Sequence, residues 1–184
     1  PAPFVTPFIF SPPSLQNKGS RIPVSKKEEK TNVMRLLAQA GIPYTPHYYP
    51  HPDGPVDGAT VARTLGQPAE KVFKTLVTRG ASRGSYYVFV VPVEKELDLK
   101  AAARAAGEKS VEMLHVAELL PLTGYVRGGC SPVGMKKLFP TFIDQSAQGQ
   151  DTIMVSGGRI GTQVELDPEA LCALIRGQFA PVAL

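Results

Sequence analysis

Two β-rich segments joined by a short glycine-containing link constrain the fold of this chain more than any other feature. Residues 72–78 alternate in character and are rich in β-branched side chains, and residues 86–93 show the same pattern more strongly. The link between them, residues 79–84, contains Gly80 and Gly84, as is typical of a tight connection between antiparallel strands. The sequence therefore predicts a β-hairpin near the middle of the chain.

Helices are predicted on both sides of this hairpin. Ser25 and Glu28 have the spacing of a capping box, and apolar residues then recur at helical spacing as far as Gly41, so we expect a helix of about four turns here. Asp98 is the expected N-cap of an alanine-rich helix that ends at Gly107. Further helical segments are expected over residues 60–65, over residues 115–120, and after Asp167 with Pro168 in the first position.

Short strands are predicted between these helices, without the regular alternation of a βαβ fold. They cover residues 44–49, 141–143, 152–155 and 162–166. We therefore expect an α/β fold, with one mixed sheet and flanking helices, in a single domain over residues 25–184. Residues 1–24, in which prolines interrupt an apolar run and basic residues follow it, are interpreted as an N-terminal extension or a leader added for expression.

The composition narrows the class of protein. The two cysteines, Cys130 and Cys172, are far apart, which argues against a disulfide scaffold or a zinc site and fits a reducing compartment. Apolar runs fall short of the ~20 residues that span a bilayer, so we expect a cytoplasmic protein that makes no use of a membrane. The net charge of +4 permits contact with a phosphate backbone but does not require it.

Lys74 is the first candidate functional residue. Strand alternation places it on one face with Val72 and Leu76. A lysine among apolar neighbours can be partly buried and directed at an anionic or carbonyl group. The alternative is a lysine that extends past the sheet edge into solvent, and the alternation alone favours that alternative.

Two glycine-rich segments are the next candidates. Paired glycines in residues 128–134 would let the backbone approach a ligand closely and leave amide groups free to bind it, although an ordinary turn explains them equally simply. Cys130 lies in this segment with no histidine beside it to activate a nucleophile. Residues 155–161 carry a serine and an arginine and would suit either an anion or hydroxyl site or a hairpin turn. His47 and His51 are spaced too widely to chelate one metal, so no metal site is expected.

Taken together, these segments resemble the YbaK family of aminoacyl-tRNA deacylases, which is related to the editing domain of bacterial prolyl-tRNA synthetases. The resemblance covers roughly residues 29–180. Its pieces occur in the family's order and are HYY (47–49), VFKTLV (72–77), LDLK (97–100), KSVEM (109–113), TGY (123–125), GGCSPVG (128–134), PT (140–141) and VSGG (155–158).

The resemblance implies a mixed α/β fold with a partly barrel-like central sheet and a pocket for the 3′ end of aminoacylated tRNA. It assigns the catalytic role to Lys74. It assigns substrate binding to Tyr49, Thr75, Gly128, Gly129, Pro132, Ser156 and Gln163. At Gln163 the family often has an aspartate, so this chain lacks a charge there and its substrate preference stays open.

The activity implied by the resemblance is trans-editing, the hydrolysis of a mischarged tRNA, with Cys-tRNA(Pro) as the expected substrate. The thiol of that substrate would attack its own ester, so that no protein nucleophile and no cofactor is needed. The implied partners are the aminoacylated 3′ end of tRNA and prolyl-tRNA synthetase. Two alternatives remain: a deacylase of Ala-tRNA(Pro) or another mischarged tRNA, and a non-catalytic module that binds tRNA or a synthetase.

Overall fold

The computed structural model describes residues 29–184, and its first element is a helix that begins later than the sequence suggests. Helix α1 spans Asn32–Gln39, and the hydroxyl of Thr31 accepts a hydrogen bond from the backbone N–H of Met34 at 3.2 Å. This cap sets the start of the helix, because it satisfies an amide that has no partner within the helix. The predicted helix of four turns is therefore wrong. The predicted extension and capping box lie outside the described residues.

The remaining helices agree with the expected positions to within a few residues. They are α2 (Gly58–Thr64), α3 (Leu99–Ala106), α4 (Val116–Thr123) and α5 (Pro168–Leu174), with 3₁₀ turns η1 (Ala69–Lys71) and η2 (Gln145–Gly149). The caps explain two of these boundaries. The carboxylate of Asp98 accepts the amides of Lys100 and Ala101, and Gly107 ends α3 in the left-handed conformation.

The strands form two sheets. They are β1 (Tyr44–Tyr48), β2 (Phe73–Gly80), β3 (Tyr86–Pro92), β4 (Val111–Met113), β5 (Thr141–Asp144), β6 (Ile153–Ser156), β7 (Thr162–Leu166) and β8 (Gln178–Ala180). The larger sheet has the order β4-β2-β3-β5-β8 and the smaller one β1-β7-β6. Strands β2 and β3 pair antiparallel, which confirms the predicted hairpin, whereas β5 pairs parallel with both β3 and β8.

The mixed α/β fold is confirmed, but the strands do not form one central sheet and do not close into a barrel. One edge of β2 is occupied by β3. On the other edge β4 pairs only with residues 78–80, and β6 reaches only Val72, through a single parallel bridge to Met154. Between these two contacts no strand of the described chain pairs with this edge of β2, so the two sheets diverge there.

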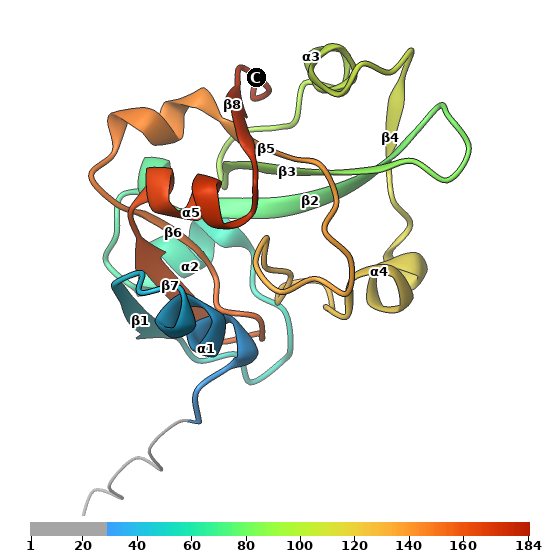
Figure 1. The fold of residues 1–184 in the computed structure, drawn as a ribbon. Helices are drawn as coiled ribbons and strands as arrows, with labels where there is room; N and C mark the ends of the chain where they lie inside the picture. Colours follow the sequence, from blue (N-terminus) through green and yellow to red (C-terminus); the bar gives the residue numbers. More distant parts are fainter. Residues whose placement is uncertain (1–28) are drawn as a thin grey trace, which may run out of the picture.

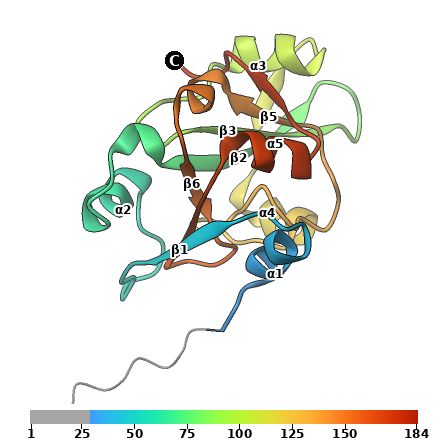
Figure 2. The same cartoon turned by 60° about the vertical axis from the view of Figure 1, so that its left-hand side comes forward.

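Side chains pack on both faces of the larger sheet. On one face α3 covers Phe89 and Phe142, whose rings stack 5.4 Å apart, with Ala102 fully buried among them. On the other face the smaller sheet, α1 and α5 enclose the main core, which includes Leu37 and Leu171. Figures 1 and 2 show α3 and α1 on opposite sides of the β2–β3 hairpin. The larger sheet is therefore covered by buried side chains on both faces.

Candidate active site

A small cavity of about 110 Å³ lies where β2 separates from β6. Six of the eight site residues predicted from the sequence line it, although they come from five separate parts of the chain. Its lining consists of Tyr49, Val56, Gly58, Val61, Val72, Phe73, Lys74, Thr75, Val93, Gly128, Cys130, Ser156 and Gln163. We refer to this cavity as the β2 pocket. Gly129 and Pro132, the other two predicted residues, do not line it.

Lys74 is the only cationic side chain among the residues that line the β2 pocket. Its side chain is 28% exposed, and its Nζ lies 3.8 Å from a carboxylate oxygen of Glu96, which is itself 84% exposed. An ion pair with so exposed a partner is weak, so the ammonium group can exchange it for an anionic or carbonyl group of a ligand. The partial burial considered for Lys74 is therefore observed, with its ammonium group beside the exposed Glu96.

Two buried polar atoms in the wall of the β2 pocket have no hydrogen-bond partner. They are the hydroxyl oxygen of Thr75 and the amide oxygen Oε1 of Gln163. Gln163 is only 7% exposed and lies in the middle strand of the smaller sheet, opposite His47 on one side and Ser156 on the other. Buried polar atoms are nearly always paired, so two that lack a protein partner in one cavity indicate a place for a polar ligand or an ordered water.

The paired glycines bring two loops together at the edge of the pocket. Gly128 has a φ of +86°, and a Cβ there would lie 2.9 Å from the side chain of Pro55. A Cβ on Gly129 would lie 2.9 Å from the backbone nitrogen of Ile160 and 3.1 Å from Cα of Arg159. The N–H of Gly129 donates to the carbonyl of Val126 at 3.0 Å, so it is not free for a ligand. Gly129 thus shapes the pocket by close packing of loops.

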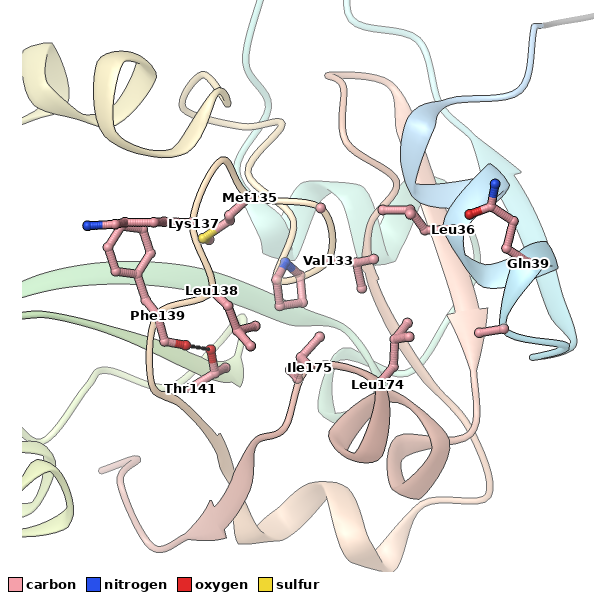
Figure 3. Close-up of a pocket in the computed structure, with 13 residues that line it drawn as sticks. Leu36, Gln39, Val133, Met135, Lys137, Leu138, Phe139, Thr141, Leu174 and Ile175 are labelled. Atoms are coloured by element: carbon pink, nitrogen blue, oxygen red, sulfur yellow. Dashed lines mark hydrogen bonds between the residues drawn. The ribbon is translucent and has the colours of Figure 1, made fainter.

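Pro132 lies on the far side of the same loop and lines a different cavity. This cavity has a volume of about 400 Å³ and is bounded by α1, α5 and residues 132–139. Figure 3 shows Leu36, Val133 and Leu174 facing it. Its lining is largely apolar, with Lys137 as the one charged side chain. The larger cavity therefore does not contain the candidate catalytic lysine.

Cys130 lines the β2 pocket but does not have the surroundings of a nucleophile. It is 8% exposed, and burial raises the pKa of its thiol to about 12. The thiol is therefore protonated at neutral pH, and a protonated thiol is a poor nucleophile. Its contribution to the pocket is that of a small neutral side chain.

Tyr49 and Ser156 also line the β2 pocket. Tyr49 is 5% exposed, and its backbone N–H donates to the carbonyl of Gly161 at 3.0 Å, which fixes β1 against the loop between β6 and β7. The hydroxyl of Ser156 accepts the N–H of Gly158 at 3.2 Å. Both residues stabilise the turn at residues 157–161, which contacts Gly129.

An ionic cluster beside the pocket was not foreseen from the sequence. Glu165 accepts hydrogen bonds from Lys71 Nζ at 2.7 Å and from Thr152, and contacts His47 Nε2 at 2.9 Å. The hydrogen bond from Lys71, followed by that from Thr152, lowers the pKa of Glu165 to about 2. Strand alternation places Glu165 on the same face as Gln163, and this alternation is the sequence signal that could have predicted its position near the pocket. The cluster joins the smaller sheet to η1, which leads directly into β2.

The described residues offer no metal site and no membrane span. Within residues 29–184 no group of three or more His, Cys, Asp or Glu side chains could hold a metal ion. No helix in that range is long and apolar enough to cross a membrane.

The chain belongs to the family of aminoacyl-tRNA editing domains, whose sequence pattern matches residues 56–174. It is 46% identical over 157 residues to a protein of Enterococcus faecalis named "Putative Cys-tRNA(Pro)/Cys-tRNA(Cys) deacylase EbsC", covering 85% of this chain and 95% of that one. It is 29% identical over 97 residues to the proline–tRNA ligase of Fervidobacterium nodosum, covering 53% of this chain but 16% of the ligase.

A solved structure shares the fold. It is described as "a putative trans-editing enzyme for prolyl tRNA synthetase" and superimposes with a TM-score of 0.71 at 25% identity, covering 83% of this chain and 94% of that one. The resemblance inferred from the sequence motifs is therefore confirmed at the level of the family.

Proposed function

We propose that this aminoacyl-tRNA deacylase hydrolyses Cys-tRNA(Pro), and that residues 25–184 form its catalytic domain. The observation that supports this most is the convergence of Lys74 with Tyr49, Thr75, Gly128, Ser156 and Gln163 around one small cavity. A volume of about 110 Å³ suits a short aminoacyl side chain. The relative in Enterococcus faecalis, whose name includes Cys-tRNA(Pro), supports cysteine as that side chain.

Lys74 binds the reacting end of the substrate in this proposal. Its ammonium group would donate to the ester carbonyl oxygen or to the terminal phosphate, replacing the weak contact with Glu96. A cation at the carbonyl stabilises the negative charge that develops on the oxygen during attack. Gly129 and Pro132 do not line the pocket. They act indirectly, by holding the loop that places Gly128 and Cys130 in its wall.

The nucleophile is the thiol of the substrate itself. Its sulfur attacks the carbonyl carbon, the bond from that carbon to the ribose oxygen breaks, and the thiol proton passes to that oxygen. The resulting cyclic thioester then takes up water and becomes free cysteine. The protein contributes orientation and electrostatics, and the protonated state of Cys130 supports a route without a protein nucleophile.

The partners in this proposal are the aminoacylated 3′ end of tRNA and prolyl-tRNA synthetase, in the cytoplasm. The similarity of 97 residues to part of a proline–tRNA ligase supports the second partner. The synthetase would supply the recognition of the tRNA body, which leaves this chain to act on the aminoacyl end.

The test compares three esters on the same tRNA: cysteinyl, S-methylcysteinyl and alanyl. We expect rapid loss of cysteine and slow loss of the other two, because S-methylation removes the attacking thiol. Equal loss of cysteine and S-methylcysteine would contradict the thiol mechanism. Faster hydrolysis of the alanyl ester would identify a deacylase of Ala-tRNA(Pro). Tight tRNA binding without hydrolysis of any ester would identify a non-catalytic binding module.

A further inference from the structure

The two unpartnered atoms in the β2 pocket can both accept a hydrogen bond. Gln163 Oε1 is an acceptor, and the hydroxyl oxygen of Thr75 can accept as well as donate. Each atom is fully shielded from water and has no partner within the protein. Leaving such groups unpaired costs stability, so a ligand that donates to both would recover that cost on binding.

The arrangement of charge in the β2 pocket indicates which end of a ligand meets these acceptors. The Lys74 side chain is 28% exposed and its ammonium group lies beside the exposed Glu96, whereas Gln163 is only 7% exposed. A ligand that fits must therefore be electron-rich near the mouth and carry hydrogen-bond donors at its inner end. An aminoacyl ester has this polarity, with its carbonyl and phosphates on one side and its α-ammonium group on the other.

We propose that Gln163 and Thr75 bind the α-ammonium group of the aminoacyl ester. This inference rests on the proposed function and makes it more specific. The ammonium group donates three hydrogen bonds, and two of them would be accepted by Gln163 Oε1 and the Thr75 hydroxyl. The terminal amide of Gln163 can turn toward the ligand at little cost, because its last torsion is broad.

The α-ammonium group would be bound by uncharged acceptors, because no carboxylate lines the β2 pocket. Glu165, two residues along β7, is engaged by Lys71, Thr152 and His47 and does not line the pocket. Recognition of the α-ammonium group is independent of the side chain, so selection among amino acids falls to the size of the cavity and the neutral wall at Cys130.

The experiment compares Cys-tRNA(Pro) with N-acetylcysteinyl-tRNA(Pro) under single-turnover conditions, each rate being divided by the spontaneous hydrolysis of the same ester. Acetylation removes the ammonium group but keeps the thiol. The variants are Gln163→Leu, Thr75→Val and Gln163→Glu, with Gln178→Leu on the exposed part of β8 as the matched control. Urea midpoints establish that each variant is folded.

The wild type should prefer the free amine by about 10- to 100-fold, the usual effect of hydrogen bonds to a charged group. Gln163→Leu should lose about that factor on the free amine and little on the acetylated ester. Thr75→Val should show the same pattern with a smaller loss, and Gln163→Glu and Gln178→Leu should keep the preference.

A folded Gln163→Leu variant that slows both esters equally, or neither, would overturn the inference. A wild-type protein that hydrolyses neither ester would overturn the proposed function as well, and the wild-type rate alone distinguishes that outcome.

Discussion

Replacement of Gly129 by alanine should destabilise the protein through a purely steric effect. Gly129 does not have a positive φ, so alanine adopts its backbone conformation without strain. The new Cβ, however, would lie 2.9 Å from the nitrogen of Ile160 and 3.0 Å from the carbonyl carbon of Arg159. Both are backbone atoms that cannot rotate away, so the two loops must separate by about half an ångström to reach ordinary contact.

Overpacking of this kind costs about 1–3 kcal/mol. Urea unfolding followed by circular dichroism should therefore show a lower midpoint at an unchanged slope. Deacylation should also slow, because Gly128 and Cys130 would move with the loop that lines the β2 pocket.

Gly149 provides the matched control for this substitution. It also has no positive φ, and a Cβ there would meet nothing within 4 Å. Gly149→Ala should leave activity unchanged and alter the free energy of unfolding by less than about 1 kcal/mol, in the stabilising direction. Equal effects of the two substitutions, or a Gly129→Ala variant as stable as the wild type, would refute the steric argument.

Three further substitutions test other parts of the structure. Glu165→Gln should lower stability at pH 7 by about 1–2 kcal/mol after allowance for solvent screening. The carboxylate's contribution to stability is fully present above the usual pKa of 4.5 and is lost as the pH falls toward the folded pKa of about 2. The urea midpoints of variant and wild type should therefore converge in acid. A difference in midpoint that stays constant with pH would contradict this. Cys130→Ala should retain the deacylation rate within about threefold, because burial keeps the thiol protonated. A folded but inactive variant would show that the cysteine is catalytic. Asp144→Ala should cost about 2–4 kcal/mol in urea unfolding, because the backbone amides of Val182 and Ala183 lose their acceptor; an unchanged midpoint would show that they find another.

The elements that could be predicted from the sequence are those with strong local signals. The β2–β3 hairpin has two β-branched runs and a short glycine-containing link, and α3 has Asp98 and Gly107 at its ends. Strands β4 and β8 have three residues each, too few to show alternation, and they exist because neighbouring strands offer them an edge. The start of α1 was missed because Ser25 and Thr31 are both acceptable N-caps in sequence.

The β2 pocket was predicted through the family resemblance rather than through local chemistry. Alternation alone favours a solvent-exposed Lys74. The pocket around this lysine depends on the position at which β2 and β6 separate, and no local sequence pattern predicts that position. Contacts between distant segments were likewise not predictable. The pairing of Lys71 with Glu165 and the approach of Gly129 to residue 160 each require the complete fold.

The most direct test of the account is the rate at which Cys-tRNA(Pro) loses cysteine in the presence of the Lys74→Ala variant. Lys100→Ala serves as control, since Lys100 is an exposed lysine on α3, remote from the β2 pocket. We predict that Lys74→Ala slows deacylation by about 100-fold or more while remaining folded, the scale of losing one electrostatic contact to the reacting oxygen, and that Lys100→Ala does not. Full activity of a folded Lys74→Ala variant would contradict the central claim that this lysine acts on the ester.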